Sequence, residues 1–130
     1  MKPGDWAERE LTVQNRGSED FNYHLEVKRT SGSENLYEAL VFEVRDAEKQ
    51  LFKGTLDQFS GFPSRFLQSA HEEDIMLKIE FPAELGNEYQ GLEVEVLFMF
   101  FSFLRGKLLM IQVLLLVKAQ IIKHRLIKVD

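Results

Sequence analysis

The segment that decides the fold runs FNYHLEVKR over residues 21–29, where apolar and polar side chains alternate. Phe21, Tyr23, Leu25 and Val27 fall on one side of an extended chain, and the polar residues between them fall on the other. A period of two is typical of a strand with one face against a core and the other in water. We therefore predict a half-buried strand at this place.

The same alternation recurs at short intervals along the chain. Trp6 to Asn15 is the first such segment, and we expect it to pair antiparallel with residues 21–29. Ser33 is placed to cap a single helical turn that ends at Leu40. Further strands are expected at 40–44 and 51–56, joined as a hairpin by a short polar turn, and at 75–81 and 92–100. Residues 57–69 form a long connection held to the core by Phe59, Phe62, Phe66 and Leu67. Six or seven strands with almost no helical periodicity before residue 104 predict an all-β fold, an antiparallel immunoglobulin-like or jelly-roll β-sandwich with one short helical turn.

Composition limits the classes of function that this chain can have. A length of 130 residues suits one domain, and the chain contains no cysteine, which excludes disulfides and cysteine-based zinc sites. Residues 1–104 contain ten Lys or Arg against twenty Asp or Glu, whereas residues 105–130 contain six against one. An acidic body repels nucleic acid, so we expect no DNA or RNA partner. The N-terminus has no apolar segment typical of a signal peptide.

Three stretches of sequence carry a resemblance to a known family. Pro3-Gly4-Asp5 precedes a strand that ends in Val13-Gln14-Asn15-Arg16-Gly17, residues 31–40 form a Ser/Gly loop with a short helix, and Asn87-Glu88-Tyr89-Gln90-Gly91 leads into the last strand before the tail. In order and spacing, from about residue 2 to residue 100, they resemble the TasA/camelysin family of bacterial cell-surface proteins. We interpret the matching residues Pro3, Gly4, Asp5, Asn15, Gly17, Asn87, Tyr89, Gln90 and Gly91 as structural, with Gly91 at a bend and a close approach.

The resemblance implies a secreted or cell-wall-attached protein of Gram-positive bacteria, hence an extracellular location. Some members build fibrous biofilm matrix, and in fibre-forming members an N-terminal strand can be donated to the neighbouring subunit. The strand expected before Lys2 is missing here, which predicts an open groove or a bare sheet edge. The first functional hypothesis is therefore a non-catalytic structural or matrix module that self-associates, or adheres to other surface proteins, through its sheet edges. A camelysin-like metal-dependent peptidase and an adhesin for glycans or host matrix are the alternatives.

Several candidate catalytic and metal-binding residues have simpler interpretations. His71-Glu72-Glu73-Asp74-Ile75 begins like the zinc motif H-E-x-x-H, but Ile75 stands where the second His is required, so we expect an acidic turn leading into a strand. His24 and His124 are interpreted as surface residues. Glu8 with Glu10, and Glu93 with Glu95, are expected on wet strand faces. Among Trp6, Tyr23, Tyr37 and Tyr89, only Tyr37 and Tyr89 are expected in exposed segments where a sugar ring could stack. We predict no enzyme, no metal and no cofactor.

The segment 105–130 differs in character from the sandwich predicted over residues 1–104. Its apolar run, residues 108–117, is shorter than the 20 or so residues that cross a bilayer, and Lys118 ends it. One interpretation is a basic helix lying on an anionic membrane surface. The interpretation that we prefer is a frame-shifted or chimeric end. Both interpretations make the run an aggregation hazard if it is exposed.

Overall fold

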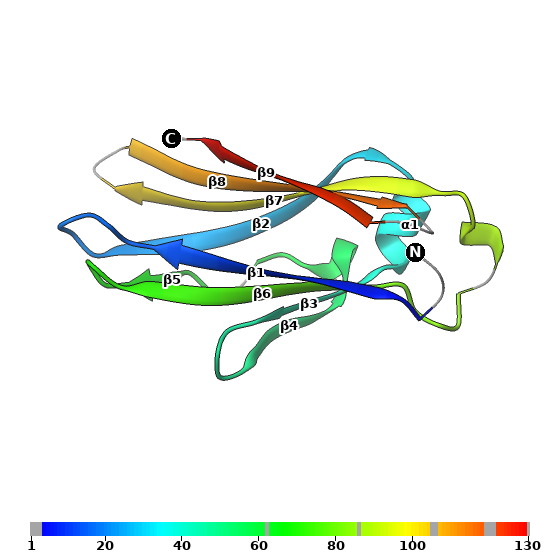
Figure 1. Cartoon of the computed structure of the whole chain (residues 1–130), viewed down its shortest axis with the longest axis horizontal. Helices are drawn as coiled ribbons and strands as arrows, with labels where there is room; N and C mark the ends of the chain where they lie inside the picture. The colour runs from blue at the N-terminus through cyan, green and yellow to red at the C-terminus, as the bar shows by residue number, and fades with distance from the viewer. Residues whose placement is uncertain (1–3, 62, 86, 105–106, 119–121, 130) are drawn as a thin grey trace.

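Two antiparallel sheets packed face to face form the fold in the computed structural model, which describes residues 4–61, 63–85, 87–104, 107–118 and 122–129 (Figure 1). Within these residues the sheet orders are β1-β6-β3-β4 and β5-β2-β7-β8-β9. The first sheet comprises β1 (Trp6–Gln14), β6 (Glu72–Glu80), β3 (Val41–Arg45) and β4 (Gln50–Thr55). The second comprises β5 (Arg65–Leu67), β2 (Phe21–Gly32), β7 (Glu93–Leu104), β8 (Lys107–Lys118) and β9 (Ile122–Val129). The all-β antiparallel sandwich predicted from the alternation is confirmed.

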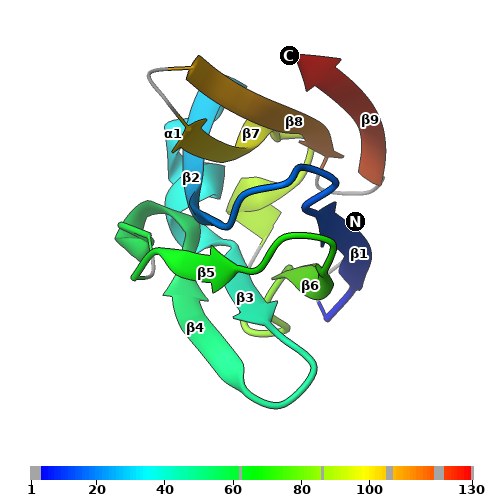
Figure 2. The same ribbon diagram turned by 90° about the vertical axis from the view of Figure 1, so that its left-hand side faces the viewer.

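The core lies between the two layers, which Figure 2 shows end-on. Tyr23 and Leu25 are buried while Asn22 and His24, which alternate with them, are exposed, so the predicted faces of β2 are confirmed. Phe42 of β3 joins the layers, because its ring lies 5.4 Å from that of Phe98 on β7. Inward side chains from both sheets therefore interdigitate, as expected for a sandwich.

The expected pairing of Trp6–Asn15 with residues 21–29 is wrong. β1 pairs with β6 along its whole length, whereas β2 pairs with β7 and, over three residues, with β5. The chain changes sheets between β1 and β2, where the backbone N–H of Asn15 donates to His71 O at 2.9 Å. Alternation shows which face of a strand is buried, but two strands that face the same core from opposite layers have the same pattern.

The helical turn and the hairpin occur as predicted. Helix α1 (Glu34–Ala39) is capped by Ser33, whose hydroxyl accepts from the backbone N–H of Leu36 at 3.0 Å. β3 and β4 form the expected hairpin. Two single turns of 3-10 helix, η1 (Leu56–Gln58) and η2 (Asn87–Tyr89), lie in the connections.

The long connection 57–69 contains the short strand β5, which the sequence pattern did not predict. Phe59 and Leu67 are buried as expected, but Phe66 is 62% exposed, so its predicted contact with the core is wrong. In an extended segment neighbouring side chains point to opposite faces, and burial of Leu67 turns Phe66 outward. Phe62 lies outside the described residues.

The described part of the tail forms strands, so the helical conformation expected for it is wrong, and its contact with a membrane surface stays a prediction. β8 pairs with β7 in an unbroken register from Glu93 opposite Lys118 to Leu104 opposite Lys107, and β9 pairs with β8. A strand here satisfies the backbone groups along one edge of β7, which a helix would leave unpaired. No helix among the described residues has both the length and the apolar character needed to cross a membrane. A frame-shifted origin of this segment stays a prediction.

Candidate functional site

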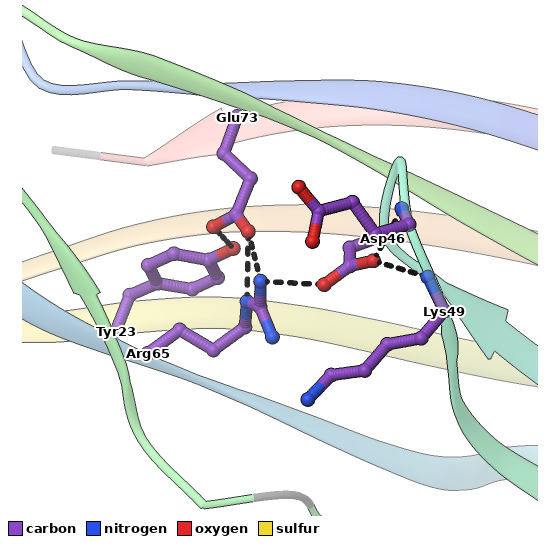
Figure 3. Close-up of polar contacts among 6 residues, drawn as sticks. Tyr23, Asp46, Lys49, Arg65 and Glu73 are labelled. Atoms are coloured by element: carbon purple, nitrogen blue, oxygen red, sulfur yellow. Dashed lines mark hydrogen bonds and ion pairs between the residues drawn. The ribbon is translucent and has the colours of Figure 1, made fainter.

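Four polar side chains from both sheets meet at one end of the sandwich, and we call this group the inter-sheet clasp (Figure 3). Tyr23 comes from β2 and Arg65 from β5, both in the five-stranded sheet. Glu73 comes from β6, and Asp46 follows β3 in the other sheet. The side chains of Arg65, Asp46 and Glu73 are only 12–21% exposed. The clasp is therefore a largely buried polar group that ties one sheet to the other.

Glu73 accepts from both residues of the opposite sheet. The Tyr23 hydroxyl donates to Glu73 Oε2 at 2.6 Å. Arg65 donates through Nε to Glu73 Oε1 at 3.0 Å, and its Nη2 also contacts that oxygen. Both carboxylate oxygens are thus engaged, and charge-assisted hydrogen bonds of this kind compensate a carboxylate for the water that it loses on burial.

Asp46 joins the clasp to the β3–β4 hairpin. Its Oδ2 accepts from Arg65 Nη2 at 2.9 Å, and its Oδ1 accepts from the backbone N–H groups of Glu48 at 2.8 Å and Lys49 at 2.7 Å. Burial alone would raise the pKa of the Asp46 carboxyl, but these hydrogen bonds and the Arg65 charge outweigh it, so the pKa lies below its ordinary value. An Asp at the first position of a turn is typical of this geometry.

The protonation of the clasp residues suits a structural role rather than general acid–base catalysis. Burial, together with the hydrogen bond to Glu73, raises the pKa of the Tyr23 hydroxyl well above its ordinary value. The hydrogen bond with Glu73 likewise raises the pKa of the Arg65 guanidinium. Tyr23, Arg65 and Asp46 therefore keep one protonation state across neutral pH, whereas a general acid or base needs a pKa near the working pH.

Replacing Asp46 by asparagine is expected to lower the free energy of unfolding at pH 7 but to have little effect in strong acid. Asn keeps an oxygen for the turn but loses the ion pair with Arg65. Because the folded pKa is lowered, the contribution is fully present above the unfolded value near 3.8 and is lost as the pH falls through the folded pKa. Urea unfolding of both proteins from pH 7 to pH 2 measures this, and a difference that stays constant with pH would contradict it.

Asn15 and Gly17, from the first stretch that resembles the TasA/camelysin family, form the corner between the sheets. Asn15 is 2% exposed, and its Nδ2 donates to Glu19 O at 2.8 Å and to Leu67 O at 3.0 Å. Its Oδ1 accepts from the backbone N–H of Gly17 at 3.0 Å. Through these contacts the Asn15 side chain links the end of β1 to the end of β5.

The opening motif extends the β1–β6 pairing. The N–H of Gly4, whose φ is +91°, donates to Phe81 O at 2.6 Å, and the N–H of Phe81 donates to Asp5 O at 2.8 Å. A positive φ suits glycine here because it lacks a Cβ. Pro3 lies outside the described residues.

The stretch Asn87 to Gly91 forms the turn before β7. Tyr89 is half-buried and packs edge-on against Phe81, with ring centroids 6.4 Å apart. Gly91 has a φ of +81°, so the predicted bend is present, but nothing lies within 4 Å of a Cβ built there. The close approach expected at Gly91 is therefore wrong, and the backbone angle alone accounts for glycine. Gln90 is exposed, and the Asn87 side chain lies outside the described part.

The acidic segment after His71 is a strand rather than a turn, because β6 already begins at Glu72. His71 is exposed, with Nδ1 2.9 Å from Ser69 O, while Ile75 is fully buried. His24 is exposed and stacks on Phe101. Over the described residues, no three His, Cys, Asp or Glu side chains gather in a way that could hold a metal ion.

Among the four aromatic residues considered for sugar stacking, Trp6 is the exposed one rather than Tyr37 or Tyr89. Trp6 is 56% exposed, with Lys78 Nζ 4.9 Å from its ring centroid, whereas Tyr37 is half-buried. Trp6 begins an edge strand and shares the outward face of β1 with Glu8 and Glu10, which accounts for its exposure. The acidic pair Glu8 and Glu10 is exposed on the same strand, as expected.

The sequence contains one signal for the clasp that the strand prediction missed. Glu73 shares the inward face of β6 with Ile75, two residues further along. A charged residue at an inward position predicts a buried partner of opposite charge.

No protein-family model matches this chain, and no curated protein matches it.

Proposed function

We propose that this chain is a non-catalytic structural module of the bacterial cell surface, similar to the TasA/camelysin proteins, that self-associates through its sheet edges. The observation that carries the proposal concerns β1 and β4, the two edge strands of the four-stranded sheet. Among the described residues, β1 has a strand partner only in β6, and β4 only in β3. Figure 2 places these two strands at opposite ends of the layer.

Free edges are points of attachment because half of the backbone N–H and C=O groups of an edge strand point away from its neighbour. Six of the nine residues of β1 are exposed, so its side chains leave the edge accessible. A second chain can therefore add its own strand to either end of the sheet, which is how strand addition works in other assemblies. The clasp supports this function by holding the two layers together while an edge is loaded.

The extracellular or cell-wall location is part of the same proposal, and the sequence resemblance supports it. A structural surface module must be stable and must attach to neighbouring molecules, and it needs no catalytic turnover. A buried clasp with fixed protonation and a sheet with two accessible ends fit those needs.

Sedimentation velocity of the full chain tests self-association directly. We expect the mean sedimentation coefficient to rise as the protein concentration is increased from about 1 μM to about 1 mM, the range of weak association. Peptides that copy β1 or β4 should lower it by occupying the edges, and scrambled peptides of the same composition should not. A monomer at every concentration, indifferent to the peptides, would overturn the proposal. Cleavage of casein with added zinc would instead favour the peptidase, and binding on a glycan array would favour the adhesin.

A further inference from the structure

One row of residues across the four-stranded sheet alternates in charge from edge to edge. Glu8 of β1 stands opposite Lys78 of β6, Lys78 also stands opposite Glu43 of β3, and Glu43 stands opposite Lys53 of β4. Residues directly opposite each other in adjacent strands share a face and interact. The row therefore begins with an exposed acid on one edge strand and ends with an exposed lysine on the other.

The strand directions allow the row to continue into another molecule. Each neighbouring pair in the order β1-β6-β3-β4 is antiparallel, so β1 and β4 run in opposite directions. A second copy in the same orientation, placed beside the first, sets its β1 antiparallel to β4. The sheet then continues with no change in its pattern of pairing.

We propose that copies of this chain associate head to tail, with β4 of one copy paired to β1 of the next and Lys53 opposite Glu8 of the next copy. This inference rests on the proposed self-association and names its interface. In this register the alternation of charge runs unbroken from one molecule to the next. Opposite charges directly across a strand pair stabilise the pairing, and like charges destabilise it.

The same register gives partners to two other exposed side chains. Antiparallel pairing with Lys53 opposite Glu8 sets Thr55 opposite Trp6 of the next copy, so that the indole, 56% exposed in the single chain, gains a β-branched neighbour. It also sets Phe52 opposite Arg9 of the next copy. Arg9 occupies an inward position on β1 yet is exposed in the single chain, and an arginine packs well against an aromatic ring.

Pairing of like edges brings no lysine opposite a glutamate. A two-fold arrangement of β1 about its middle sets Glu10 against Glu10 of the second copy, and a shift of one step sets Glu8 against Glu10. The corresponding arrangement of β4 gives Lys53 no acidic partner. Head-to-tail pairing is heterologous, so each added copy presents a fresh free edge and the product is an open filament rather than a closed dimer.

Charge reversal at the two edges tests the interface. Glu8→Lys gives both edges lysine, and Lys53→Glu gives both edges glutamate, so each variant alone repels its own copies. We expect each to need about fivefold more protein for half-association than the wild type. An equimolar mixture should recover wild-type association, because every junction between unlike variants joins one lysine and one glutamate. The two native side chains meet at one such junction, and the two substituted side chains meet at the next. Negative-stain microscopy should show filaments from the wild type and from the mixture.

Two controls separate the interface from general effects of charge and stability. Glu26→Lys and Lys28→Glu make the same charge changes at exposed sites on β2, and should leave association unchanged. Each substitution also places like charges side by side within its own chain, beside Lys78 for Glu8→Lys and beside Glu43 for Lys53→Glu. Urea unfolding of each variant measures how much this lowers the free energy of unfolding. Mixing the variants does not change these contacts within a chain, so they cannot account for recovered association. Wild type that associates while the mixture fails to recover would overturn this interface and leave the proposed function standing. Wild type that never associates would overturn both.

Discussion

Replacing Asn15 by alanine is expected to lower the free energy of unfolding by about 3 kcal/mol, because it removes three hydrogen bonds at a buried corner. The side chain is 2% exposed and serves Glu19, Leu67 and Gly17 together. Alanine leaves the carbonyl of Leu67 without this donor inside the fold, and an unsatisfied buried group costs more than an average hydrogen bond returns. Urea unfolding at pH 7 measures the loss.

Two further variants show whether the hydrogen bonds are the cause. Asn15→Asp keeps the volume and the acceptor for Gly17, but it loses both donors and sets a carboxylate against two carbonyl groups, so it should be at least as unstable as the alanine variant. Asn22→Ala removes an exposed asparagine from β2 and should change stability by less than about 0.5 kcal/mol. If the alanine variants at Asn15 and Asn22 were equally stable, the corner would not have the role proposed for it.

The strands and their buried faces follow from local chemistry, which explains why the sequence predicted them. Tyr23 and Leu25 are apolar at a period of two, and that pattern needs no knowledge of the rest of the chain. The partner of a strand is a different matter. β1 pairs with β6, which lies some 60 residues away, because both complete the same layer, and nothing in the alternation of β1 identifies that layer. The tail was unpredictable for the same reason, since its strand conformation depends on the edge of β7.

The clasp could be predicted only in part. An Asp before a short polar turn is a recognisable signal, and Asp46 accepts from the two N–H groups that such a turn presents. Its ion pair with Arg65 joins residues 19 positions apart, and Arg65 lies in a connection with little periodicity. Glu73 was detectable as a charge on an inward face. Its partners were not, because they depend on how the two sheets are stacked.

Replacing Arg65 by alanine is expected to lower the free energy of unfolding by about 2–3 kcal/mol at pH 7, since it leaves two carboxylates without their cation. Glu73 and Asp46 are 21% and 12% exposed, and without the guanidinium each carboxylate stays in a place that water reaches poorly. The same change removes an anchor of β5, a strand of three residues that pairs with β2 over its whole length. We therefore expect faster amide exchange at Phe21 and Tyr23 than elsewhere in β2.

The arginine–carboxylate pair of Arg45 and Glu43 provides a matched control for this variant. Arg45 Nη1 lies 3.2 Å from Glu43 Oε2, but the Arg45 side chain is 48% exposed. Exposed ion pairs contribute little to the free energy of unfolding. Arg45→Ala should change the free energy of unfolding by less than about 0.5 kcal/mol under the same conditions. Arg65→Lys keeps the charge but cannot bridge two carboxylates with a planar fork, so it should fall between the wild type and the alanine variant. Equal losses at Arg45 and Arg65 would mean that burial of the clasp adds nothing to its strength. A larger loss at Arg65, recovered partly by lysine, would identify the paired geometry across the two sheets as the source of stability at this end of the sandwich.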